Sequence, residues 1–185
     1  MNAPTRKITL VFCILLWGVC TLQAQKESPN SEQSCLHFTQ AFYNWYTTQV
    51  FKSFKAKNGK AAWHAALSYE GNPFSRELTR ALIESDAEAK TDGDPVLDFD
   101  PILNSQDPAN RYVVRSVTSN NGRYWAAVYG VWSRVVSDRG KGPQVVAELM
   151  RNDGRWEFVN FHYPDNTSPN NENLLRMLRF QSHPR

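Results

Sequence analysis

The side chains best suited to chemistry gather in one stretch near the middle of the chain. From residue 97 to residue 107 the sequence reads LDFDPILNSQD, in which acids and amides alternate with large apolar residues. Carboxylates beside apolar groups can act as general acids or bases, and amides can orient a bound ligand. We call residues 97–107 the acid-and-amide segment. Its acids and amides are candidate ligand-binding residues: Asp98, Asp100, Asn104, Gln106 and Asp107.

Aromatic and histidine side chains elsewhere extend the set of candidates. Tyr43 and Trp45 belong to an aromatic run that could stack on a ligand, although burial against a sheet is the simpler explanation of such a run. His162 and His64 could each act as a base beside a carboxylate of the segment. The sequence holds no nucleophile elbow, phosphate-binding loop, zinc signature or supported Cys–His arrangement, so it predicts no catalytic residue. Tyr43, Trp45 and His162 therefore join the set as ligand contacts.

The aspartates in and before the segment invite a calcium hypothesis. Calcium loops of the EF-hand type place acids at alternate positions, glycine at the sixth position and glutamate at the twelfth. Here Pro101 and the apolar pair after it interrupt that spacing. Asp100 before Pro101 instead matches a helix N-cap followed by proline at the first helical position. We therefore expect local capping, with neither a metal ion nor a cofactor.

The amino terminus has the pattern of an export signal. Arg6 and Lys7 precede an apolar run that ends at Cys20 and is too short to span a bilayer, and small Ala24 fits a cleavage point. The sequence thus predicts a signal peptide over residues 1–24 and a periplasmic or secreted protein. The alternative is a lipoprotein held on a membrane through Cys20. Cys35 is the one cysteine after the signal, so we expect no internal disulfide and a buried thiol.

Charge and length limit the partners and the domain count. The 185 residues include 21 basic and 18 acidic side chains, and removal of the signal peptide would leave a net charge of +1. A nucleic-acid partner would need a dominant basic face, so we expect none, and the sequence predicts no oligomeric state. We expect a flexible leader over residues 25–34 and a single domain over residues 35–185.

Hydrophobic periodicity predicts helices first and strands second. Helical spacing covers residues 32–51, 60–68, 75–91 and 173–180, and Ser75 can cap the third of these helices. Strand patterns cover residues 111–117, 123–136, 144–151 and 155–163, with Asn121-Gly122 and Asp153-Gly154 as hairpin turns. Alternation would place Phe158 and His162 on one face of the last strand and Phe161 on the other. These elements predict an α+β fold in which N-terminal helices pack on a curved antiparallel meander of about four strands.

Two stretches carry a resemblance to a known family. The run Phe42-Tyr43-Asn44-Trp45-Tyr46 and the acid-and-amide segment, with the export signal and the hairpins, resemble an uncharacterised family of exported bacterial proteins, domain-of-unknown-function family 3828. That family is similar to the nuclear-transport-factor-2-like superfamily. The resemblance covers about Cys35 to Tyr163 and implies a cone-like fold and an envelope location, but no catalytic residue.

Two classes of function follow. The first is an envelope binding module for a small molecule, a peptide or a protein partner, which needs no catalytic constellation. The second is an isomerase or dehydratase, because similar cone folds host enzymes that place an aspartate or histidine in an apolar pocket.

Overall fold

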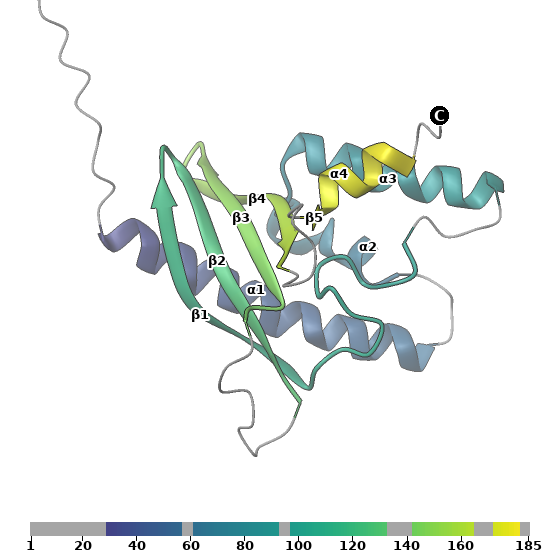
Figure 1. Cartoon of the computed structure of the whole chain (residues 1–185), viewed down its shortest axis with the longest axis horizontal. Helices are drawn as coiled ribbons and strands as arrows, with labels where there is room; N and C mark the ends of the chain where they lie inside the picture. The colour runs from purple at the N-terminus through teal and green to yellow at the C-terminus, as the bar shows by residue number, and fades with distance from the viewer. Residues whose placement is uncertain (1–28, 57–60, 93–96, 133–141, 165–171, 182–185) are drawn as a thin grey trace, which may run out of the picture.

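The computed structural model describes residues 29–56, 61–92, 97–132, 142–164 and 172–181. The helical part comprises α1 (Pro29–Ala56), α2 (Trp63–Ala66), a short 3-10 helix η1 (Tyr69–Gly71) and α3 (Arg76–Asp92). The strands are β1 (Arg111–Asn120), β2 (Arg123–Val131), β3 (Val145–Asn152), β4 (Arg155–Tyr163) and β5 (Glu172–Asn173), followed by α4 (Leu174–Gln181) (Figure 1). The α+β prediction is confirmed; the expected signal peptide lies outside the described residues.

The strands form one antiparallel sheet in the order β1-β2-β3-β4-β5. Its two tight hairpins turn where the sequence predicted. Asn121 and Gly122 have φ of 51° and 75°, and Asp153 and Gly154 have φ of 47° and 81°. Two successive positive φ angles are typical of the turn that matches the twist of paired strands, and asparagine, aspartate and glycine adopt them most readily. The short strand β5 was not predicted.

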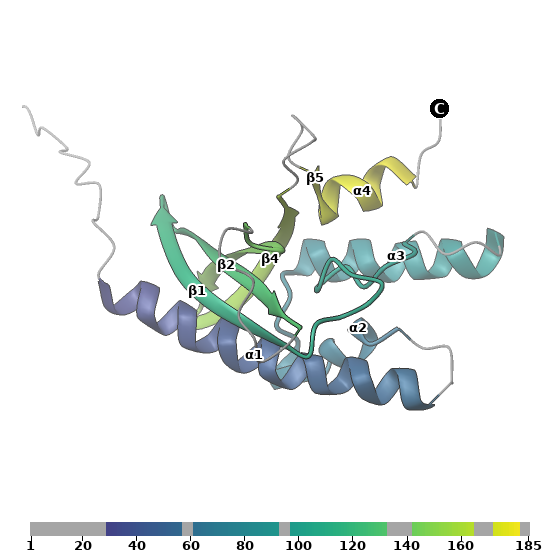
Figure 2. The same cartoon turned by 60° about the horizontal axis from the view of Figure 1, so that its bottom comes forward.

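Two β-bulges bend the sheet and change which side chains share a face. One lies in β1 between Val114 and Ser116, and the other lies where β3 pairs with β4, opposite Glu148. Because of the second bulge, Phe158 and Phe161 lie on the same face, with ring centroids 5.3 Å apart. The prediction that they lie on opposite faces is wrong. A bulge inserts one extra residue into a strand, which increases its local twist. Figure 2 shows the resulting curvature of β1 and β2.

Helix α1 packs against the inner face of this sheet (Figures 1 and 2). Its buried stripe includes Phe42, Tyr43 and Tyr46, and Cys35 is fully buried as expected. Burial raises the pKa of the Cys35 thiol to about 12, so the group stays protonated at neutral pH. The helix begins at Pro29. Residues 29–34 of the flexible leader predicted for residues 25–34 are therefore helical, and residues 25–28 lie outside the described residues.

One glutamine of α1 protects the open edge of the sheet. Gln40 Nε2 donates to the carbonyl oxygen of Tyr112 at 3.0 Å, and Gln40 Oε1 accepts from the backbone N–H of Val114 at 2.8 Å. The side chain takes the place of a neighbouring strand at these two residues of β1. Unpaired edge groups otherwise invite association with another chain.

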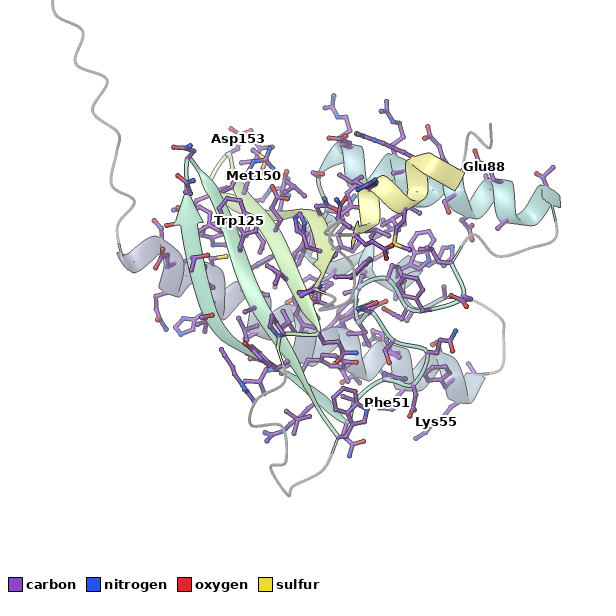
Figure 3. All side chains as sticks on the ribbon, in the orientation of Figure 1. Phe51, Lys55, Glu88, Trp125, Met150 and Asp153 are labelled. Carbon is purple, nitrogen blue, oxygen red and sulfur yellow. The ribbon has the colours of Figure 1, made fainter. Side chains whose placement is uncertain are left out.

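The opposite face of β1, β2 and β3 is covered by none of the described helices (Figure 2). It carries partly exposed side chains, among them Trp125 and Met150, which Figure 3 labels over β2 and β3. We call it the outer face. None of the described helices is both long enough and apolar enough to cross a membrane.

Candidate ligand-binding groove

The acid-and-amide segment folds into a closed turn around Asp100. Asp100 Oδ1 accepts the backbone N–H groups of Ile102 and Leu103, each at 3.0 Å, so the predicted capping is confirmed, although residues 101–104 form a turn and not a helix. The backbone N–H of Asp100 donates to the carbonyl oxygen of Ser105 at 3.0 Å and closes the turn. Asn104 has φ of 50°, a left-handed conformation that asparagine tolerates.

Three tyrosine hydroxyl groups hold this turn from outside. Tyr46 of α1 donates to Asp100 Oδ2 at 2.7 Å, and Tyr43 donates to the carbonyl oxygen of Ile102 at 3.0 Å. Tyr163 of β4 donates to the carbonyl oxygen of Pro101 at 2.7 Å. Burial raises the pKa of all three hydroxyl groups well above 10, so they remain neutral donors. The turn is thus joined to the helices and to the sheet.

The Asp100 carboxyl is the most perturbed acid in the described part of the chain. Its burial raises the pKa from 3.8 to about 6, although the hydrogen bonds from Tyr46, Leu103 and Ile102 act in the opposite direction. Desolvation penalises the charged form more than three donors stabilise it. Both carboxyl oxygens already have partners, so Asp100 serves the turn.

A groove of about 790 Å³ lies beside this turn. The end of α1, α2, α3, the acid-and-amide segment and α4 all contribute to its lining, and Figure 2 shows the segment folded back between α1 and α3. Most of the lining is apolar: Val50, Phe54, Ala61, Ala62, Trp63, Leu82, Ala89, Leu97, Phe99, Pro101 and Leu178. Phe54 is 57% exposed, which is unusual for a phenylalanine and places apolar surface at the groove.

A histidine–aspartate pair forms part of the groove wall. His64 Nε2 lies 3.3 Å from Asp86 Oδ2, and His64 Nδ1 lies 3.0 Å from the carbonyl oxygen of Ala61. The imidazole ring also stacks on Trp63, with centroids 3.8 Å apart. Both ring nitrogens therefore face protein oxygens, and Asp86 was not singled out by the sequence because it lies 22 positions away on another helix.

The groove brings together three of the predicted site residues. Asp98, Asp100 and Gln106 all line it, and Gln106 Nε2 donates to Asp98 Oδ2 at 3.0 Å. Asn104 lies behind the turn and pairs with Gln144. The side-chain amide of each residue donates to the backbone carbonyl oxygen of the other, both at 3.2 Å. Asp107 is exposed beyond the groove, and its carbonyl oxygen accepts from Ser105.

The other three predicted contacts lie elsewhere. Tyr43 is fully buried beneath the turn. Trp45 packs on Tyr69 with ring centroids 4.6 Å apart, as part of the aromatic cluster on α1. His162 lies on the outer face, where its Nε2 is 2.8 Å from Glu148 Oε2. Tyr43 is thus buried against the sheet as expected, beside Tyr112 of β1, whereas Trp45 is partly buried and contacts aromatic rings of α1 and η1.

Glu148 also borders a second, polar hollow of about 520 Å³. Arg123 Nη1 lies 3.3 Å from Glu148 Oε1, and Arg155 Nη2 lies 3.8 Å from Glu157 Oε1. The His162 hydrogen bond, with smaller help from the charges of His162 and Arg123, lowers the pKa of Glu148 against the opposing effect of burial. We call this hollow the polar hollow; two carboxylates of its lining, Glu148 and Glu157, each pair with an arginine.

Neither metals nor relatives add to this picture. In the described part of the chain, no three His, Cys, Asp or Glu side chains gather in the way that a metal ion requires. Comparisons of the sequence with family models and curated proteins, and of the fold with solved structures, found no match.

Proposed function

We propose that the protein is a binding module that holds a small apolar molecule in the groove. One observation carries this proposal: a hollow of about 790 Å³ is lined mainly by apolar side chains from five separate segments. Small-molecule sites have volumes of roughly 300–1,000 Å³ and combine an apolar lining with a few placed polar groups. Asp98 and Gln106 are such groups.

The anchoring of the groove wall supports the same function. The turn that carries Asp98 to Gln106 is held by hydroxyl groups from α1 and β4. A wall fixed in this way loses little further conformational freedom when a ligand binds, which favours affinity.

An isomerase or dehydratase is the second candidate, because His64 shares the groove with Asp98 and Asp100. An acid–base mechanism needs a group that can exchange a proton with the substrate. Both nitrogens of His64 face oxygens of the protein, and both oxygens of Asp100 accept hydrogen bonds within it. Binding requires no such group and is therefore the function that we favour.

We propose in addition that residues 1–24 are a signal peptide and that the protein acts in the periplasm or outside the cell. The alternative remains a lipoprotein anchored through Cys20. The α+β architecture supports, at the level of fold class, the resemblance to domain-of-unknown-function family 3828 and to the nuclear-transport-factor-2-like superfamily. Intact mass of the exported protein tests location: Gln25 as first residue supports the signal peptide, and a lipid-modified Cys20 supports the anchor.

A neutral fluorescent probe tests the binding function. N-Phenyl-1-naphthylamine is apolar, uncharged near neutral pH and brighter when removed from water. We expect it to bind the wild-type protein, and Ala89→Phe, which adds a ring inside the groove, to weaken binding roughly tenfold or more.

The matched control is Ala87→Phe, the same change on the exposed face of α3. It should bind as the wild type does. Failure of the wild type to bind this and related neutral probes, or equal binding by the Ala89 variant, would contradict the proposal.

A further inference from the structure

We propose that the ligand of the groove is an apolar amine, a molecule with a hydrophobic body and one protonated nitrogen. This inference rests on the proposed binding function and adds the chemical class of the ligand. It is carried by the charge of the groove, by the direction of its hydrogen bonds and by its aromatic lining.

The charge of the groove favours a cation. Its described lining includes three carboxyl groups, those of Asp86, Asp98 and Asp100, and no lysine or arginine. His64 is the one basic side chain among these lining residues, and it pairs with Asp86. An anionic ligand would meet carboxylates without a free positive partner, and like charges repel.

The hydrogen bonds favour a ligand that donates. The Ser53 hydroxyl donates to the carbonyl oxygen of Val50 at 2.8 Å, and the Ser105 hydroxyl donates to the carbonyl oxygen of Asp107 at 2.6 Å. Both nitrogens of His64 face protein oxygens as well. The two hydroxyl groups have committed their hydrogens to the protein, and what they leave for a ligand is acceptor capacity.

Asp98 is the residue best placed to receive the nitrogen. It is exposed at the groove, and Gln106 fixes its Oδ2 at 3.0 Å. An ionised carboxylate has about four acceptor sites, and no described residue occupies its other oxygen. A charge-assisted N–H···O bond to a carboxylate is roughly twice as strong as a neutral one.

The aromatic lining suits the rest of the molecule. Phe54, Trp63 and Phe99 come from α1, α2 and the acid-and-amide segment. Their faces can contact an apolar body, and a ring face also attracts a nearby positive charge. An amphipathic amine would use both kinds of group at once.

A matched set of naphthalene compounds tests the inference near neutral pH. 2-Naphthylmethylamine is cationic, 2-naphthylmethanol is neutral and 2-naphthoate is anionic, whereas the ring system is the same in all three. Calorimetric titration of the full chain should give binding of the amine roughly tenfold tighter than of the alcohol, and weaker binding of the anion.

Two variants locate the charge. Asp98→Asn should reduce the affinity for the amine to that for the alcohol and leave the alcohol unaffected. Asp153→Asn removes the same charge at the β3–β4 turn (Figure 3), where asparagine suits the positive φ, and should leave both affinities unchanged.

The outcomes separate the two proposals. Equal binding of all three compounds, or a preference for the anion, would overturn the amine inference and leave the binding function standing. An amine preference that survives in Asp98→Asn would overturn the role of Asp98. Binding of none of the three would count against the binding function itself.

Discussion

The groove contains a histidine–carboxylate pair, and the carboxylate of a second such pair borders the polar hollow, but the surroundings of the two pairs differ. In the groove, His64 lies 3.3 Å from Asp86 among side chains that are mostly apolar. At the polar hollow, Glu148 lies 2.8 Å from His162, which is outside the lining, and is also contacted by Arg123. The stronger ion-pair network lies where the apolar lining is poorer. The lining, rather than the titratable pair, therefore distinguishes the proposed ligand site from the ion pairs of the polar hollow.

The two regions also differ in how they are anchored. The groove wall depends on a turn held by three buried tyrosine hydroxyl groups and one buried carboxyl. The ion pairs at the polar hollow join side chains of β2, β3 and β4, whereas the pairing of these strands is made by backbone groups. Loss of polar contacts should thus cost more at the groove than at the hollow.

Replacement of Asp100 should give the largest effect. Asp100→Ala removes the acceptor for the N–H groups of Ile102 and Leu103 and leaves the Tyr46 hydroxyl without its partner, which should lower the free energy of unfolding by about 2–4 kcal/mol. Urea denaturation followed by circular dichroism measures this. Glu148→Ala is the matched change in the polar hollow and should cost less than about 1 kcal/mol. Equal losses in the two variants would contradict the comparison.

The pH dependence of stability should separate Asp100 from the other acids. Its folded pKa of about 6 lies above the usual 3.8, so the folded protein binds this proton more tightly than the unfolded chain does. The resulting stability is fully present below the usual pKa and is lost as the pH rises through about 6. Asp100→Asn keeps an acceptor for the cap and removes the charge.

Relative to the wild type, the Asp100→Asn protein should therefore gain stability as the pH rises from about 4 to about 7. The largest gain that this change in pKa allows is about 3 kcal/mol. Denaturation curves across this range test it. A difference between variant and wild type that stays constant with pH would show that the carboxyl is not desolvated in the way described.

Single tyrosine hydroxyl groups should have intermediate effects. Tyr163→Phe removes the donor to the Pro101 carbonyl oxygen and should cost about 1 kcal/mol. Tyr129→Phe is the control, because Tyr129 is partly exposed on the outer face with Arg115 over its ring, and it should unfold as the wild type does. Thermal melts of the two variants suffice; a larger loss in the Tyr129 variant would reverse the ranking.

The smallest effect should come from the polar hollow. The hydrogen bond with His162 lowers the pKa of Glu148 below its usual value of 4.5. The stability from this pair is therefore present above pH 4.5 and is lost as the pH falls through the lowered pKa of Glu148. Because both side chains are partly exposed, Glu148→Gln should cost less than about 1 kcal/mol at neutral pH. Chemical denaturation at high and low salt checks this, and a loss above about 2 kcal/mol would mean a tighter network than the geometry indicates.

Local signals made most of the fold predictable from the sequence. The two glycine-containing hairpin turns were readable because their conformations need particular residues, and Ser75 caps α3 by accepting the N–H of Leu78. The bulges were not readable, because a bulge depends on how two strands pair. The strand β5 is two residues long and has no pattern of its own.

The candidate site was predictable only in part, for a related reason. Asp98, Asp100 and Gln106 stood out because they lie close together in sequence among apolar residues. Phe54 of α1 and Asp86 of α3 also line the groove, and only the tertiary fold places them beside the acid-and-amide segment. His162 was predicted as a ligand contact because of its residue type, but the register of β4 places it on the outer face.

Binding of an apolar amine in the groove can be tested by following the indole N–H resonances of Trp63 and Trp125 during titration with 2-naphthylmethylamine. Trp63 lines the groove, and Trp125 lies on the outer face. We expect the Trp63 resonance to move in a saturable way and the Trp125 resonance to stay fixed. Movement of Trp125 with Trp63 unchanged would contradict this expectation.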